Sequence, residues 1–132
     1  MNWGLILQLS VFGLAMAIAT VFWISSAVEP FFWFGIFVVC AYVIALQASR
    51  RYFLHGLLVS VVNSVWITTA HIALFDQYIA RHPQEAAMLS ESSMPGRVLM
   101  AMMGPVIGVL SGIVLGLFAV GASKLVRPAG RR

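Results

Sequence analysis

Four long apolar segments dominate this chain, and its charged residues fall almost entirely in the connections between them and in the tail. The segments cover residues 3–25, 31–47, 53–76 and 97–123. At a rise of about 1.5 Å per residue, helices of these lengths are close to or longer than the roughly 30 Å hydrocarbon core of a bilayer. The sequence therefore predicts an all-α fold, a four-helix transmembrane bundle in which residues 1–132 form a single integral membrane domain.

The composition argues against a soluble protein. The chain is 61% hydrophobic and 9% charged, whereas soluble domains carry about 25% charged residues. A soluble fold of this length could not cover so much apolar surface. We expect the lipid bilayer as its surroundings and a multi-pass location in the cell membrane, most simply a bacterial inner membrane. The net charge of +4 does not indicate a nucleic-acid partner, because its distribution follows membrane topology.

The charged residues also predict the orientation. With four spans, the side that holds both termini carries six basic residues and no acid, and the opposite side carries four acids and two basic residues. Connections rich in Lys and Arg remain in the cytoplasm. We therefore expect both termini inside, with a basic cytoplasmic tail over residues 124–132.

The longest connection is an outer loop over residues 77–96, between the third and fourth spans. In it, Pro83 precedes Gln84 and Glu85, and a proline followed by a carboxylate is typical of a helix N-terminus. We expect a short interfacial helix over residues 84–89 and a loop over residues 90–93.

The third segment differs from the others because polar residues recur along one side of it, at steps of three or four positions. They are Ser60, Asn63, Ser64, Thr68 and His71. Asn63 is expected either to hydrogen-bond across helices or to contact a solute or ion. His71 is either a neutral, hydrogen-bonded lock between the third and fourth helices or a proton relay or ligand contact, since an ionisable residue inside a span suggests function.

The fourth segment carries a ladder of glycines at strict four-residue spacing, a pattern that lets another helix backbone approach closely. The ladder is Gly104, Gly108, Gly112 and Gly116. The third segment has a matching row of small residues, Gly56, Ser60, Ser64 and Thr68. We therefore predict that these two sequential helices pack on each other.

Two further features bear on packing. A shorter row of small residues in the first span, Gly13, Ala17 and Thr20, predicts a helix contact there. Pro105 lies inside the fourth span and removes one backbone hydrogen bond. It predicts a kink, or alternatively a hinge.

Aligning the third and fourth helices at their midpoints, near Ser64 and Leu110, places Asp76 at the depth of Arg97. We predict an outer ion pair between these two residues.

A metal or haem site has weak support. The candidates on the outer side are His71, His82, Met100 and Met103, because imidazole and thioether groups suit copper or haem iron. The first, second and fourth spans contain no histidine, which excludes a bis-histidine haem within one chain. We expect no cofactor.

Nothing in the sequence points to catalysis. It lacks a G-x-S-x-G elbow, an H-E-x-x-H pair and a phosphate-binding glycine loop. We expect no enzyme activity and name no catalytic residue.

Two classes of function remain. The first is transport or permeation of a small solute, ion or proton along the polar stripe of the third helix. We expect a homo-oligomer to build that pathway, with His71 as its proton- or solute-sensitive element. The alternative is a non-catalytic subunit or scaffold, which packs on a partner in a larger membrane complex through its glycine and small-residue faces. Copper or haem binding on the outer side is a minor alternative.

Overall fold

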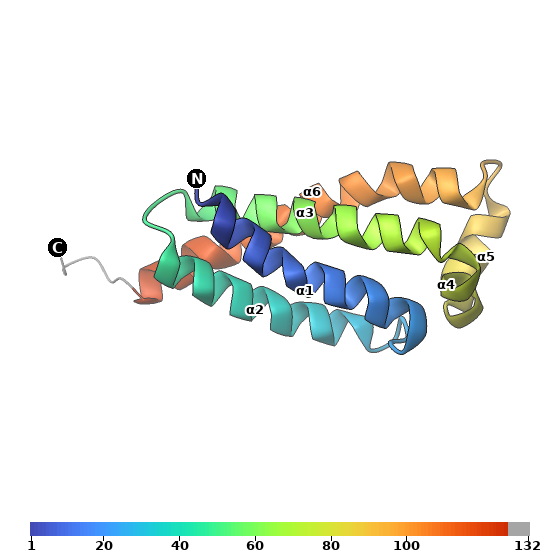
Figure 1. The fold of residues 1–132 in the computed structure, drawn as a ribbon, viewed down its shortest axis with the longest axis horizontal. Helices are drawn as coiled ribbons and strands as arrows, with labels where there is room; N and C mark the ends of the chain where they lie inside the picture. The colour runs from blue at the N-terminus through green and yellow to red at the C-terminus, as the bar shows by residue number, and fades with distance from the viewer. Residues whose placement is uncertain (127–132) are drawn as a thin grey trace.

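The computed structural model describes residues 1–126, and over that range the protein is all-helical (Figure 1). The six helices are α1 Trp3–Phe22, α2 Glu29–Gln47, α3 Tyr52–Ala73, α4 Phe75–Arg81, α5 Pro83–Glu91 and α6 Gly96–Val126. Four of them, α1, α2, α3 and α6, are long and apolar enough to cross a membrane. The predicted all-α fold with four candidate spans is thus confirmed.

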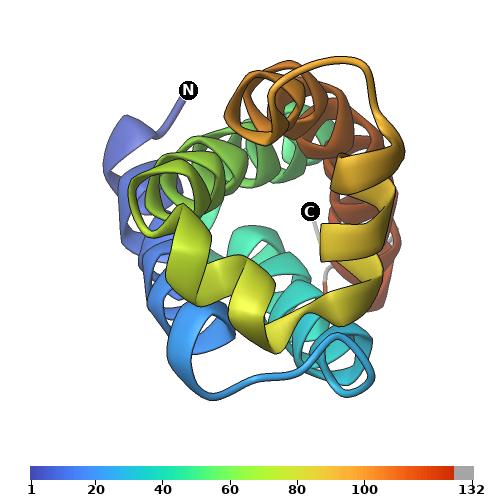
Figure 2. The same cartoon turned by 90° about the vertical axis from the view of Figure 1, so that its right-hand side faces the viewer.

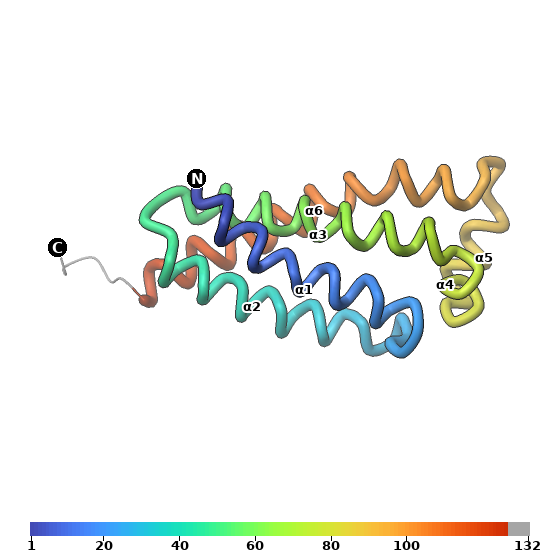
Figure 3. The backbone as a smooth tube through the Cα atoms, in the orientation of Figure 1, coloured from blue at the N-terminus to red at the C-terminus, as the bar shows by residue number. Residues whose placement is uncertain are grey.

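The four long helices run side by side as an elongated bundle (Figures 1 and 3). The strongest packing joins α3 to α6, followed by α1 to α3 and α2 to α6, so the order around the bundle is α1, α3, α6, α2. The N-terminus, the α2–α3 connection and Lys124 lie at one end, which we call the basic end. The short helices α4 and α5 cross the opposite end, the lid end (Figure 2).

The boundaries differ from expectation mainly at the lid end. The third span ends at Ala73 rather than at residue 76, because Leu74 leaves the helical conformation (φ −110°, ψ 39°). The chain then forms α4, so the outer connection contains two helices instead of one. His82 ends α4 with ψ 71°, as expected for a residue before a proline.

Helix α5 is also longer than the expected 84–89. It begins at Pro83 and continues through Ser90 to Glu91, where a loop was predicted. The Ser90 hydroxyl donates to the Ala87 carbonyl at 2.8 Å, so this serine bonds within the helix instead of ending it.

The other helix ends shift by a few residues. α1 stops at Phe22, and α2 already begins at Glu29, with Pro30 in its first turn. α6 has 31 residues and runs through Pro105 as one helix, so the kink stays a prediction. α6 also takes in Lys124 of the predicted tail, and residues 127–132 lie outside the described residues.

The glycines of α6 face α3 at very short range. A Cβ built on Gly56 of α3 would lie 2.7 Å from the Gly116 Cα, and a Cβ on Gly112 would lie 2.9 Å from the Leu57 carbonyl oxygen. Toward the lid end, a Cβ on Gly108 would collide with Ser64 and one on Gly104 with Thr68. The helices therefore touch backbone to backbone along much of their length. The register is two residues from the expected one, because Ser64 meets Gly108 instead of Leu110.

One interhelical hydrogen bond reinforces this contact. The Ser60 and Ser111 hydroxyl oxygens lie 2.8 Å apart. Ser111 also lies 2.6 Å from the Ile107 carbonyl oxygen and donates its proton there. Ser60 is therefore the donor to Ser111, and both hydroxyls are satisfied within the bundle.

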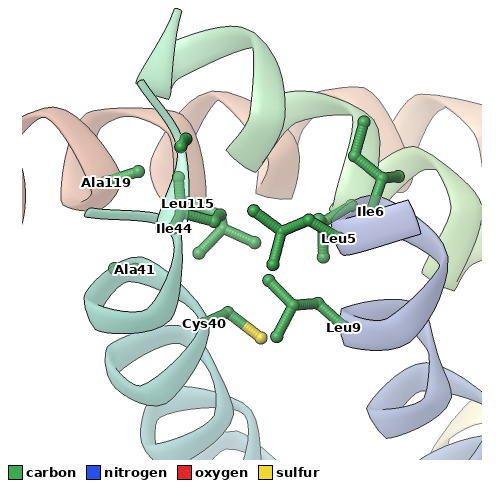
Figure 4. Close-up of a cluster of buried hydrophobic side chains, with 10 residues drawn as sticks. Leu5, Ile6, Leu9, Cys40, Ala41, Ile44, Leu115 and Ala119 are labelled. Atoms are coloured by element: carbon green, nitrogen blue, oxygen red, sulfur yellow. The ribbon is translucent and has the colours of Figure 1, made fainter. Parts of the chain in front are cut away.

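At the basic end, α1, α2, α3 and α6 converge on a close-packed apolar cluster (Figure 4). Its members are small or branched side chains with little or no exposure, namely Leu5, Ile6, Leu9, Cys40, Ala41, Ile44, Ala48, Val59, Leu115 and Ala119. Cys40 is a free thiol that packs there as a small apolar residue. This cluster closes the basic end of the bundle.

Candidate functional site

The lid end contains a cavity of about 580 Å³ between α2, α3 and α6, with α4 and α5 contributing residues above it. The polar stripe of α3 forms one wall, since the cavity borders Ser60, Asn63, Ser64, Thr68 and His71. The sequence analysis expected an oligomer to enclose such a pathway. In the structure the stripe borders a partly open cavity within one chain, with Trp33 and Phe37 of α2 in another wall.

The remaining walls are apolar and aromatic. α2 contributes Trp33 and Phe37, and α6 contributes Met100 and Met103 together with Gly104 and Ile107. Met88 and Leu89 of α5 border the cavity from the lid. The space therefore suits a mainly apolar guest, with hydrogen-bonding groups confined to the α3 side.

Two carboxylates border the same cavity. Glu29 in the first turn of α2 accepts a hydrogen bond from Trp33 Nε1 at 3.1 Å, and Glu85 of α5 accepts one from the Ser26 hydroxyl at 3.0 Å. Both residues are half-buried. The cavity lining includes no Lys or Arg, and over residues 1–126 neither carboxylate has an ion-pair partner. The lid end of the cavity is therefore negatively charged.

His71 is locked to α1, not to α6 as the sequence analysis proposed. Its Nε2 lies 2.8 Å from the Thr20 hydroxyl, which also lies 2.8 Å from the Met16 carbonyl oxygen. All three groups are satisfied when Thr20 donates to the carbonyl and accepts from Nε2–H. That arrangement places a proton on Nε2 of His71.

His71 also begins a column of stacked rings. Its ring lies 3.9 Å from that of Tyr78, and the Tyr78 ring lies 4.1 Å from that of His82, both at small interplanar angles. Each such contact contributes roughly 0.5–1.5 kcal/mol. The column joins the membrane helix α3 to the lid and fixes the lid over the cavity.

Tyr78 is the titratable group most affected by this setting outside the spans. Burial raises the pKa of its phenol well above the ordinary value, and the negative charges of Glu29 and Glu85 raise that pKa further. Both carboxylates therefore raise the pKa of the same residue of the cavity wall, Tyr78.

Of the metal-site candidates, His71, Met100 and Met103 border the cavity and His82 does not. His71 and His82 stack on opposite faces of Tyr78. The Nδ1–H of His82 donates a hydrogen bond to the Tyr78 carbonyl at 2.8 Å. No group of three or more His, Cys, Asp or Glu residues within residues 1–126 could hold a metal ion. Met100 and Met103 instead line the apolar wall.

Asn63 lacks the interhelical hydrogen bond expected of it. Its side chain is 2% exposed, and neither its amide nitrogen nor its amide oxygen has a partner in the structure. It packs against α1 at Gly13, where a Cβ would collide with the Asn63 side chain. Asn63 is thus a buried polar residue of the cavity wall whose amide nitrogen and oxygen make no hydrogen bond.

The predicted Asp76–Arg97 pair lies at the surface of the lid end. Arg97 Nη2 and Asp76 Oδ2 are 3.9 Å apart, and the two side chains are 53% and 83% exposed. Arg97 also donates from Nε to the Ile72 carbonyl at 3.3 Å and lies 4.7 Å above the Phe75 ring. These contacts hold the start of α6 against the α3–α4 joint, away from the cavity.

The sequence analysis missed several residues of this site. The sequence analysis counted Glu29 only among the outer acids, treated Glu85 as part of a helix N-terminus and treated Thr20 only as part of a small-residue row. The column of rings had a sequence signal, because His71, Tyr78 and His82 lie at positions i, i+7 and i+11, one side of a helix. The break at Leu74 does not disturb that alignment.

Comparison with known proteins adds no relative. No protein-family model matches the chain, and no curated protein and no solved structure matches it.

Proposed function

We propose that this protein binds a small, mainly apolar solute in the lid-end cavity and moves it across the membrane without chemical conversion. The observation that carries this proposal is the position of the α3 polar stripe, which borders an intrachain cavity. A stripe that served packing alone would be covered by neighbouring helices along its whole length. Ser60 and Ser64 touch α6 and also border the cavity, so the stripe serves both purposes.

Passage through the bundle needs an opening at the basic end, where the apolar cluster closes the path. We therefore infer an alternating mechanism, in which the basic end opens in a second state. Pro105 lies in the cavity half of α6 and supplies the proposed hinge.

We also propose that both termini are cytoplasmic and the lid faces outward. Arg50, Arg51 and Lys124 lie at the basic end, and Glu29, Glu85 and Glu91 at the lid end, as the positive-inside rule requires. Single cysteines at Ser49 and Glu91 in a Cys40→Ala background test this. A membrane-impermeant maleimide should label Glu91→Cys, and not Ser49→Cys, in intact bacterial cells.

Proteoliposomes loaded with a panel of small solutes test the transport proposal. We expect counterflow of at least one solute, and loss of this flux in Ile67→Trp, because Ile67 borders the cavity and the larger ring fills it. Val65→Trp is the matched control, since Val65 is 57% exposed on the outside of the same helix. Flux equal to that of protein-free liposomes for every solute would end the transport proposal.

A scaffold role is the second candidate, supported by the large outward apolar surface of α6, where Leu110 and Leu117 are each 60% exposed. A partner would dock there and not on the glycine ladder, which α3 covers. A mild-detergent pull-down should then recover a stoichiometric partner or a second copy. Purification as a lone monomer would contradict the scaffold role and the expected oligomer alike.

A further inference from the structure

The cavity lining includes two acidic residues and no Lys or Arg. Glu29 and Glu85 come from different helices, α2 and α5, yet both border the cavity and both are half-buried. Their hydrogen bonds come from neutral donors, Trp33 Nε1 and the Ser26 hydroxyl. Arg97 is engaged with Asp76 and Phe75 on the outer surface, and Arg81 of α4 is exposed and does not border the cavity. Within residues 1–126 neither carboxylate forms an ion pair.

The walls next to these carboxylates suit a positive charge on an apolar molecule. Trp33 and Phe37 of α2 border the cavity, and aromatic rings attract cations and favour organic ammonium groups in particular. Met88, Met100 and Met103 add polarisable, adaptable surface. A small hydrated inorganic ion would find few oxygen ligands there, because calcium and magnesium prefer sets of six or more oxygens.

Resting on the solute-binding role above, we propose that the lid-end cavity binds an amphipathic organic cation. Its positive charge lies at Glu29 and Glu85, and its apolar body lies against the aromatic and methionine walls.

Tetraphenylphosphonium and tetraphenylborate test the proposal, because they share a shape and carry opposite charges. Equilibrium dialysis measures the binding of each ion to lipid nanodiscs that contain the full chain, with empty nanodiscs as the baseline. We expect saturable binding of the phosphonium alone. Glu29→Gln with Glu85→Gln should weaken it by about tenfold or more, whereas Glu91→Gln, an exposed lid carboxylate away from the cavity, should leave it unchanged.

The outcomes separate this inference from the transport proposal. Equal saturable binding of both ions, or unchanged binding in the glutamine double variant, would overturn the cation assignment, and solute counterflow would still support transport. Saturable, glutamate-dependent phosphonium binding without counterflow of any solute would support the cation site and overturn transport. Each glutamine variant is checked for folding by thermal unfolding. Should the double variant fail to fold, each single variant gives the same comparison, with a smaller expected loss of phosphonium binding.

Discussion

In the basic half of the bundle, the helices meet through small residues and an apolar cluster, whereas in the lid half they separate around a cavity. Helix α2 contributes to both halves and shows the cause. Its lid-end residues are bulky, including Trp33 and Phe37, and its basic-end residues Ala41 and Ala45 are small and buried. Large side chains hold the neighbouring helices apart, and small ones let them close.

The two halves also differ in how they treat polar groups. Near the basic half, Ser60 and Ser111 satisfy each other. In the lid half, Asn63 and His82 Nε2 are buried without partners, and two carboxylates face a cavity. Tight packing with satisfied groups provides stability, and a space with two carboxylates in its wall provides capacity to bind. The following changes test that division.

The largest effect is expected from a methyl group in the tight half. Gly56→Ala places a Cβ 2.7 Å from the Gly116 backbone, which no rotamer change can relieve. We expect a loss of about 3 kcal/mol, the upper range for overpacking, measured by thermal or denaturant unfolding in detergent. Gly121→Ala is the control, since nothing lies within 4 Å of its built Cβ. An equal stability of the two variants would refute the close contact.

A moderate effect is expected where α1 holds the lid half. Thr20→Val removes the acceptor of the His71 Nε2 proton, and a double-mutant cycle with His71→Phe isolates their coupling. We expect about 0.6–1.7 kcal/mol, the range for hydrogen bonds between membrane helices. Additive effects of the two substitutions would show that the pair does not interact.

Asn63→Leu should have the opposite sign. The leucine is similar in size and removes two buried polar atoms without partners. We expect a gain in unfolding free energy of roughly 1 kcal/mol, together with weaker solute flux in liposomes. Ser60→Ala, which breaks the bond to Ser111, should instead destabilise the protein. A destabilised Asn63→Leu protein would mean that the amide is satisfied in the membrane.

A smaller effect is expected from alkaline pH. Because the folded-state pKa of Tyr78 is raised, its stabilising contribution is complete below the unfolded value of about 10 and is lost as pH rises through the folded pKa. Ultraviolet absorbance titration of the wild type minus Tyr78→Phe should place this ionisation above the ordinary tyrosine range. Glu29→Gln and Glu85→Gln should move it downward. A difference titration at the ordinary value would contradict the buried setting of the ring.

The smallest effect is expected at the outer surface. Asp76→Asn breaks a long, exposed ion pair, and such pairs contribute about 0–1 kcal/mol. We expect a change below about 0.5 kcal/mol that disappears in high salt. Exchanging Asp76 and Arg97 should keep the fold. A larger loss would place this contact among the structural supports of the lid.

The sequence predicts the tight half better than the open one, for physical reasons. The pairing of α3 with α6 follows from small residues at matched spacing on sequential helices, and only the register differs by two residues. The cavity depends on how far α2 stands from α3, which local patterns do not determine. The roles of Glu85 and Thr20 arise from contacts over more than 50 positions, and the fold of the lid onto the bundle creates them. Glu29 bonds locally to Trp33, and its role arises because the bundle places it at the cavity.

The length of α6 links this protein to the thickness of its membrane. Thirty-one residues span about 46 Å, against roughly 30 Å of hydrocarbon, so α6 must tilt or extend beyond the hydrocarbon core. The shorter α2, on the other side of the cavity, has 19 residues and no such excess. A thinner bilayer would increase the tilt of α6 relative to α2 and change the distance between the cavity walls. Lipid chain length would thereby act on the site without touching it.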